Sequence, residues 1–278
     1  MTVIATNTAA MRATAASNTA NSALSEAMNR LSTGKRINSA KDDAAGLAIA
    51  ASMTSQIRGM SQGIRNANDG ISMAQTAEGA LDEVTNMLQR MRELGVQAGN
   101  DTYSTEDKKN IAAEQKALAT QIDSVLKNTT FNGQTLFDAK AGAAGDGKVT
   151  IQAGANAADT VTLDLSTDLT AAAGKTTTVT AAASATTPIT DLKQFDDAIA
   201  EIANTRAGLG ASQNQLESAV NNLTSNVNNL SDAKSRIEDA DFSTESTNLA
   251  KAQILAQAST AMLAQANQSQ QGVMKLLQ

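Results

Sequence analysis

Two short runs of carboxylates are the most obvious candidates for chemistry in this sequence. One run, "KDDAAG", contains Asp42 and Asp43, and the other, "RIEDAD", contains Glu238, Asp239 and Asp241. Neighbouring carboxylates can hold a divalent cation or act as a general acid and base. Both runs lie where helices are expected to begin or end, however, and carboxylates commonly cap helices there. We interpret them as caps and expect no metal site and no catalytic site.

The composition also argues against catalysis. The 278 residues include no His and no Cys, so the commonest general base and all thiol chemistry are absent. The run "GAAGDGKVT" is rich in glycine but lacks the G-x-x-x-x-G-K-[ST] spacing of a phosphate-binding loop, and it is more typical of a hairpin turn. An enzyme would have to depend on carboxylate pairs alone. We therefore expect neither an enzyme nor a cofactor.

Charge and targeting signals limit the partners and the compartment. The net charge of −6 and the lack of a basic stripe argue against binding to nucleic acid or to an anionic membrane. The N-terminal residues lack the charged start and continuous apolar stretch of a secretory signal, and no run approaches the roughly 20 apolar residues of a membrane span. These rules alone predict a cytosolic protein without membrane insertion.

The elements that carry these residues are mostly helices. The chain has four Phe, one Tyr and no Trp, so its core must be aliphatic and rich in Ala, as in helix bundles. Over about residues 8–31, Leu24, Met28 and Leu31 follow a helical spacing, and Gly34 ends it. Ser39 is predicted to cap the next helix, with Asp42 three residues later.

One heptad-like pattern predicts a single helix over about residues 42–96. Such a helix would be roughly 80 Å long at 1.5 Å per residue, which favours a rod over a globule. Four glycines interrupt it, and they mark either the close approach of another helix or subunit, or tolerated defects. These glycines are Gly59, Gly63, Gly70 and Gly79. The predicted core seam of this helix consists of Met53, Ile57, Met60, Ile64, Ile71, Leu81 and Leu88.

The middle of the chain changes its periodicity. Ser104 and Asp107 form a second predicted capping box, for a helix that ends near Asn128. The runs "KVTIQAG" and "DTVTLDLS" alternate with β-branched residues and predict two strands joined by Gly and Asn turns. Residues 166–187 are a low-complexity Thr and Ala segment, which predicts either an exposed loop or a short hairpin.

A return helix starting near Thr190 has the strongest periodic signal in the chain. Its apolar residues repeat every seven positions, which predicts a long antiparallel partner for the helix over 42–96. The predicted fold is mainly α, a long antiparallel helical rod or coiled coil from both chain ends, with a small β-hairpin region in the middle. The repeating residues, the second half of the predicted core seam, are Phe195, Ile202, Leu209, Leu216, Leu223, Leu230 and Ile237.

The last 28 residues, "KAQILAQASTAMLAQANQSQQGVMKLLQ", carry a thinner apolar stripe. A seven-residue spacing gives two rows that would form an a/d seam against other helices. Ala and Ser bury little surface, so this helix would be marginal alone and is predicted to depend on assembly. One row contains Leu255, Met262, Ser269 and Leu276, and the other contains Ala252, Ser259, Ala266 and Val273.

A charged cluster, "LQRMRELGVQAGN", lies near the end of the long helix. Arg90 and Leu94 are one turn apart on the same face, and Glu114 on the following antiparallel helix is expected beside them. Periodicity alone favours a solvated face with ordinary ion pairs.

Three long runs resemble bacterial flagellin. They are "ALSEAMNRLSTGKRINSAKDDAAGLAIAASMTSQIRGM", "GISMAQTAEGALDEVTNMLQRMRELGVQAGN" and "SRIEDADFSTESTNLAKAQILAQASTAMLAQANQSQQGVMKLLQ". The resemblance covers about residues 1–137 and 190–278 and implies a short subunit without large outer domains. The implied organisation is an inner-core helix and linker (1–40), outer-core long helices (41–137), β-hairpins with a short variable segment (138–189), an outer-core return helix (190–238) and a C-terminal inner-core helix (239–278).

The same resemblance implies a function and a location. It implies a structural subunit that self-assembles into the flagellar filament for swimming motility, and that leaves the cell unfolded through the flagellar type III apparatus. The expected location is then the extracellular flagellum, which reverses the cytosolic assignment. The implied partners are other copies of the chain, the flagellar cap and hook-junction proteins, and a flagellin export chaperone.

The charged cluster also gains an implied role. Arg90, Leu94 and Glu114 match the flagellin surface that Toll-like receptor 5 recognises and that contacts neighbouring subunits in the filament. Gly95 stands where many recognised members have Ala.

Other classes of protein remain as alternatives. One is an export-system or hook-junction component of similar helical build. Another is a surface-exposed flagellin homologue acting as an adhesin or ligand-binding protein, with residues 140–187 as its exposed face. A third is an enzyme that works without His or Cys.

Overall fold

The computed structural model describes residues 6–170 and 174–275, with side chains up to Gly272. The chain forms two compact units, one from residues 1–55 and 229–278 and the other from residues 56–228. The helices α2 (Ala44–Ala98) and α5 (Leu192–Glu238) each contribute residues to both units. The predicted fold class, mainly α with a small β-hairpin region, is confirmed.

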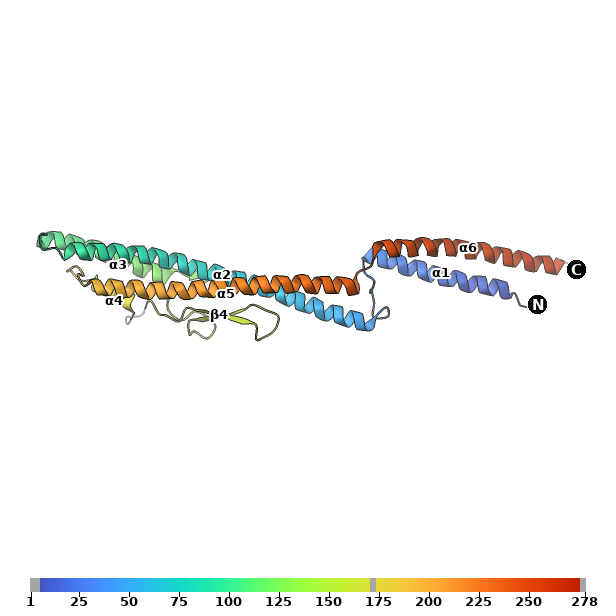
Figure 1. Cartoon of the computed structure of the whole chain (residues 1–278), viewed down its shortest axis with the longest axis horizontal. Helices are drawn as coiled ribbons and strands as arrows, with labels where there is room; N and C mark the ends of the chain where they lie inside the picture. Colours follow the sequence, from blue (N-terminus) through green and yellow to red (C-terminus); the bar gives the residue numbers. More distant parts are fainter. Residues whose placement is uncertain (1–5, 171–173, 276–278) are drawn as a thin grey trace. The chain divides into compact units, whose positions relative to one another are not determined.

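The first unit is built around α1 (Thr8–Thr33) and α6 (Phe242–Lys275), which lie side by side (Figure 1). The Asn7 side-chain amide donates to the Ala266 carbonyl at 3.3 Å, and Arg30 lies 3.9 Å from Glu245. Rising numbers on α1 therefore meet falling numbers on α6, so the two helices are antiparallel. The first helix ends at Gly34, whose φ of 70° is left-handed and favours glycine, as predicted.

A short clasp joins the segment after α1 to the end of α5. Lys35 and Asp239 form an isolated antiparallel bridge, and the Arg36 N–H donates to the Glu238 carbonyl at 2.7 Å. The Glu238 carboxylate is nearly buried, and it pairs with Lys35 and with Lys234. The hydrogen bond from Lys35 lowers the pKa of Glu238 below its ordinary value.

Asp43 caps the start of α2, so the predicted capping role of Ser39 is wrong. The Asp43 carboxylate accepts the Gly46 N–H at 2.8 Å, in the first turn of the helix. Ser39 lies too far ahead of Ala44 to reach those amides. Its own N–H instead donates to Asp42 at 2.9 Å and closes a turn before the helix.

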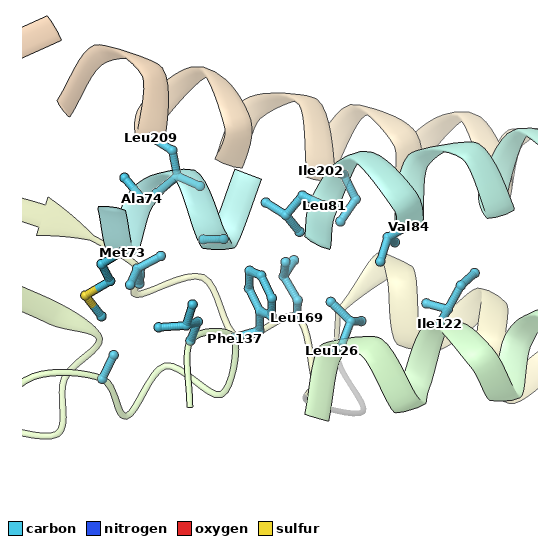
Figure 2. Packing of buried hydrophobic residues seen from close by; sticks show 14 of the residues in the cluster. Met73, Ala74, Leu81, Val84, Ile122, Leu126, Phe137, Leu169, Ile202 and Leu209 are labelled. Atoms are coloured by element: carbon cyan, nitrogen blue, oxygen red, sulfur yellow. The ribbon is translucent and has the colours of Figure 1, made fainter. Parts of the chain in front are cut away.

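The second unit packs α2 against α3 (Thr105–Asn128) and α5. The predicted capping box of Ser104 and Asp107 is present at the start of α3. Figure 2 shows aliphatic side chains of the three helices pointing toward one another, together with Phe137 and Leu169 from the segment between α3 and α5. The labelled helical residues in this cluster are Met73, Ala74, Leu81, Val84, Ile122, Leu126, Ile202 and Leu209.

Ion pairs confirm that α5 is the antiparallel partner of α2 within this unit. Arg92 lies 2.7 Å from Asp196, and Asp82 lies 3.0 Å from Arg206. Residue numbers therefore fall along α2 as they rise along α5, so the two helices run antiparallel.

The predicted core seam is buried only along part of its length. Phe195, Ile202, Leu209 and Leu216 of α5 have no exposed surface, and they share one cluster with Phe137. The segment between α3 and α5 thus buries α5 side chains that α2 and α5 could not bury by themselves. Met60, Leu81 and Leu88 of α2 are also buried. The remaining seam residues are half-buried, namely Met53, Ile57, Ile64, Ile71, Leu223, Leu230 and Ile237.

Within residues 6–170 and 174–275, four strands form two antiparallel pairs. The first pair is β1 (Thr130–Phe131) with β2 (Gln134–Thr135), joined by an Asn-Gly turn. The second is β3 (Lys148–Gln152) with β4 (Thr160–Asp164), in which Thr150 faces Thr162. The second pair confirms the two strands predicted from β-branched alternation.

The β3–β4 hairpin explains three of the four glycines in α2. A Cβ added to Gly63 would lie 2.7 Å from the Ala153 carbonyl oxygen, which is too close for any side chain. Added Cβ atoms at Gly59 and Gly70 would collide with side chains of the same hairpin. The element that approaches α2 closely at these three glycines is therefore a hairpin of the same chain, joined at Gly70 by Leu216 of α5.

Gly79 has a different explanation. A Cβ added there would meet nothing within 4 Å. This glycine is a tolerated defect in the helix, as the second interpretation of the sequence held.

Residues Lys175–Ala182 form α4, so the prediction of a loop or hairpin over 166–187 is wrong there. The Glu201 carboxylate accepts the Thr176 N–H at 3.0 Å and the Thr176 hydroxyl at 2.9 Å. Val179 is fully buried in the core of the unit. The Thr and Ala composition carries no helical periodicity, and burial against the rest of the unit makes this segment helical.

Candidate functional site

The carboxylate runs that suggested chemistry serve the fold. Asp43 caps α2, and Asp241 accepts the Ser243 N–H at 2.9 Å and the Thr244 hydroxyl at 2.8 Å at the start of α6. In the part of the chain that the structure describes, no group of three or more Asp or Glu is placed to hold a metal ion. Within the same residues, no helix has the length and apolar character needed to cross a membrane.

The α1–α6 pair packs through small residues spaced three and four apart. Among the apolar side chains of the pair that the structure describes, only Ala20, Ala27 and Ala252 are almost fully buried, at 2–4% exposed. The pair therefore buries little surface by itself. The inward residues are Ala10, Ala13, Ser17, Ala20, Leu24, Ala27 and Leu31 on α1, and Leu249, Ala252, Ala256, Ser259, Leu263, Ala266 and Gln270 on α6.

One of the two predicted tail rows faces outward. Ala252, Ser259 and Ala266 lie on the packing side, whereas Leu255 is 47% and Met262 is 63% exposed. Ser269 is also exposed. The second row that faces α1 lies one residue further along the chain and consists of Ala256, Leu263 and Gln270. Both rows contain aliphatic residues, so the seven-residue spacing alone did not decide between them. The Val273 side chain and the whole of Leu276 lie outside the described residues.

A similar correction applies to α1. Leu24 and Leu31 face inward, but Met28 is 56% exposed and Ala27 takes its place in the seam. Small residues at the contact let the two helices approach closely, and the larger Met side chain is left outside.

The exposed apolar residues of the described chain concentrate on this helix pair. Six of the nine large apolar side chains that are markedly exposed belong to α1 or α6. An unpartnered apolar surface of this kind is typical of a contact with another protein. The six are Met11, Met28, Phe242, Ile254, Leu255 and Met262.

Two open stretches of groove lie between α1 and α6. One is mostly apolar and is lined by Ala13 and Ala16 of α1 and by Met262 of α6. The other carries both signs of charge and is lined by Glu26 and Arg30 of α1 and by Glu245 and Lys251 of α6. On α1, the residues that line one stretch lie fourteen positions from those that line the other. On α6, the corresponding spacing is seven. Both spacings are whole heptads, so both stretches open on the same side of the pair.

A second polar surface lies in the other unit, around Arg90. Its guanidinium donates to the Glu114 carboxylate at 2.9 and 3.2 Å and to Glu93 at 3.1 Å. These hydrogen bonds, chiefly that with Glu114, raise the pKa of Arg90. Leu94 is only 2% exposed and packs with Ala98, because it lies on the inner side of α2. The expected surface position of Leu94 is therefore wrong.

Gln115, next to Glu114, is a residue whose role sequence reasoning missed. Its side chain has no exposed surface, donates to the Met91 and Ile189 carbonyls at 3.2 Å, and accepts the Ile189 N–H at 2.9 Å. It therefore ties α3 to α2 and to the segment before α5. A polar residue on the apolar face of a predicted helix, one turn from Ile111 and Leu118, was the available signal.

The same segment explains Gly95. A Cβ there would lie 3.0 Å from the Ile189 carbonyl oxygen and 3.1 Å from the Phe195 ring. An Ala at this position would be tight in this chain.

Paired amphipathic helices with an exposed apolar groove are features of a structural protein that packs against other helices. Comparison with known families gives the same class. Residues 4–142 match the bacterial flagellin N-terminal helical region, and residues 192–277 match the bacterial flagellin C-terminal helical region. The chain belongs to the bacterial flagellin family.

Relatives match over most of the chain. The chain is 43% identical to a flagellin of Halalkalibacterium halodurans over 91% of each protein. It is 38% identical to the flagellar filament 31.3 kDa core protein of Treponema maltophilum, over 99% of this chain and all of the relative. A crystal structure of Bacillus cereus flagellin shares 28% identity, covering 57% of this chain and 88% of that one, with a TM-score of 0.44.

The two family matches and the two relatives bear out the resemblance seen in the sequence. The family consists of structural proteins that self-assemble into the extracellular flagellar filament, so the chain is not an enzyme. Nothing in the matches favours the adhesin alternative.

Proposed function

We propose that this chain is the subunit of a flagellar filament that drives swimming, and that it polymerises chiefly through the α1–α6 pair. The observation that carries the proposal is the concentration of exposed apolar side chains on this pair, beside a groove open along one side. The groove has the small-residue floor that lets a further helix approach closely. Burial of these side chains by other copies would stabilise the polymer by about 25 cal/mol per Å² of apolar surface.

The same proposal includes the route to the filament. The chain leaves the cell unfolded through the flagellar type III apparatus, accompanied by an export chaperone, and adds to the growing end beneath a cap protein. Two features support this route. The chain has no Cys and only one Pro, so neither disulfide formation nor several slow prolyl isomerisations would delay folding after export.

The Arg90 surface is proposed as a contact with neighbouring subunits and, in a host, with Toll-like receptor 5. Arg90 and Glu114 are about half exposed and hold each other in place, so they present a fixed pair of opposite charges. Buried Leu94 supports this surface from below and does not touch the partner.

Polymerisation seeded with filament fragments tests the proposal. The intact chain is expected to extend the seeds into long filaments visible by electron microscopy. A chain that lacks residues 251–278 is expected not to extend them, because most of α6 and both stretches of the groove are lost. Circular dichroism serves as the control, since the core of residues 56–228 contains no α6 residue and its helices should persist. Normal filaments from the truncated chain would refute the role of α6.

A further inference from the structure

Methionine thioethers are the side chains that a peroxide oxidises most readily in this chain. The sequence contains ten Met and no Cys, so the thiols that usually react first are absent. Exposure to solvent then decides which methionines react. Among the described methionines, three are mostly exposed, whereas Met73 and Met91 are buried in the core of residues 56–228. The three exposed ones are Met11, Met28 and Met262.

Met262 differs from the other two in its place on the α1–α6 pair. It is 63% exposed and lines the apolar stretch of the groove, opposite the alanines of α1. Neither Met11 nor Met28 lines either stretch. The other described residues that line the apolar stretch are Ala, Ser, Thr, Gln and one Arg, so Met262 supplies its single large apolar side chain. A partner that fills this stretch therefore contacts the Met262 side chain.

Oxidation converts this apolar side chain into a polar one. The sulfur lone pair attacks one oxygen of a peroxide and the O–O bond breaks. The sulfur keeps that oxygen as a sulfoxide, and the other oxygen leaves as water. The sulfur has then lost two electrons, which the peroxide has taken up, so no further reactant is needed.

A sulfoxide at Met262 opposes burial of the groove. Its oxygen is a hydrogen-bond acceptor that water satisfies while the groove is open, and a partner that covers the groove removes this water. Arg12 lines the same stretch and can donate to the oxygen, but it can do so in the free chain as well as in the polymer. Such a hydrogen bond lessens the desolvation penalty without favouring assembly.

We propose that Met262 is a reversible oxidation site, and that conversion of its thioether to the sulfoxide by a peroxide blocks assembly through the groove. The inference rests on the self-assembly proposed above and adds a redox control to it. A free subunit is open to peroxide at Met262, whereas a subunit in the polymer is covered there. Reversal needs two electrons and two protons, with the oxygen leaving as water, and methionine sulfoxide reductases carry it out with a dithiol as the reductant.

Dilute hydrogen peroxide applied to the free chain tests the inference. Peptide mass spectrometry is expected to find an added oxygen at the three exposed methionines and none at Met73 or Met91. After removal of the peroxide, the critical concentration for seeded polymerisation is expected to rise roughly tenfold, because an apolar contact has become a polar one. Methionine sulfoxide reductase with a dithiol should return the critical concentration to its starting value.

Matched variants separate Met262 from the other exposed methionines. Met262→Leu keeps a large apolar side chain that peroxide cannot oxidise, so it is expected to polymerise like the wild type before and after treatment. The Met11→Leu and Met28→Leu double variant keeps Met262 and should lose polymerisation on oxidation as the wild type does. Met262→Gln carries a permanent polar group and is expected to polymerise poorly without peroxide. Circular dichroism checks that every variant is folded.

Assembled filaments give a measurement that needs no substitution. Because the proposed polymer covers the groove, peroxide applied to wild-type filaments should leave Met262 unmodified in the same peptide analysis. Oxidation of Met262 in filaments as fast as in the free chain would exclude its burial by a neighbouring copy.

Three results with the free chain would overturn the inference. The first is a folded chain whose Met262 stays unmodified while Met11 and Met28 are oxidised. The second is a chain with the Met262 sulfoxide that polymerises at the untreated concentration. The third is a loss of polymerisation by oxidised Met262→Leu as large as that of the wild type. Failure of the untreated wild-type chain to polymerise would instead refute the proposed function, so the two failures are distinguishable.

Discussion

Replacing Gln115 by Leu removes a buried polar contact that joins three segments of the second unit. The Ile189 N–H, which donates to Gln115 at 2.9 Å, would lose its acceptor, and the Ile189 carbonyl would lose a donor at 3.2 Å. The Met91 carbonyl also loses a donor, but its own helix supplies another partner. A buried polar group left without a partner costs about 1–3 kcal/mol.

The expected loss of unfolding free energy is therefore roughly 2–6 kcal/mol, since two Ile189 groups are affected and Leu fills a similar volume. Urea unfolding monitored by circular dichroism measures it, and hydrogen exchange at the Ile189 amide reports the contact directly. Gln121→Leu is the matched control, because this residue is exposed on the same helix. An unchanged urea midpoint, or an Ile189 amide that stays protected from exchange, would refute the reasoning.

Three further predictions follow from packing and charge. Gly63→Val should displace the β3–β4 hairpin and lower the unfolding free energy measured in urea. Gly79→Ala should raise that free energy by up to about 1 kcal/mol. Equal effects of the two substitutions would contradict the conclusion that Gly63 is required by the hairpin and that Gly79 is a tolerated defect. Because the pKa of Glu238 is lowered in the folded chain, its contribution to stability is complete above its ordinary value of 4.5 and is lost as the pH falls through the lowered value. Glu238→Gln should therefore flatten the fall in melting temperature at acid pH, and an unchanged slope would count against the clasp. The Arg90→Ala and Glu114→Ala double variant should activate Toll-like receptor 5 less in a reporter-cell assay while its far-ultraviolet spectrum stays unchanged; full activation would exclude this surface.

The sequence by itself determined the helices with strong periodicity and local caps. Heptad spacing over 195–216 predicted the buried side of α5, and the capping box at Ser104 located the start of α3. Alternating β-branched residues predicted β3 and β4. These features are local, because side-chain periodicity and a capping hydrogen bond involve residues only a few positions apart.

The sequence also predicted that the tail depends on assembly, and this stays a prediction. It could not choose between two adjacent rows, because Leu255 and Leu263 both belong to an aliphatic heptad row. Only contact with α1 turned Leu263 inward and left Leu255 exposed.

The remaining features depend on residues far apart in the chain. α4 forms where Glu201 accepts Thr176 and the core covers Val179, and no short-range pattern marks either contact. Gly63 is required because Ala153 lies against it, and Leu94 is buried because Ala98 and Ile111 surround it. Periodicity gives the face of a helix, but the element that covers that face is fixed only when the chain folds.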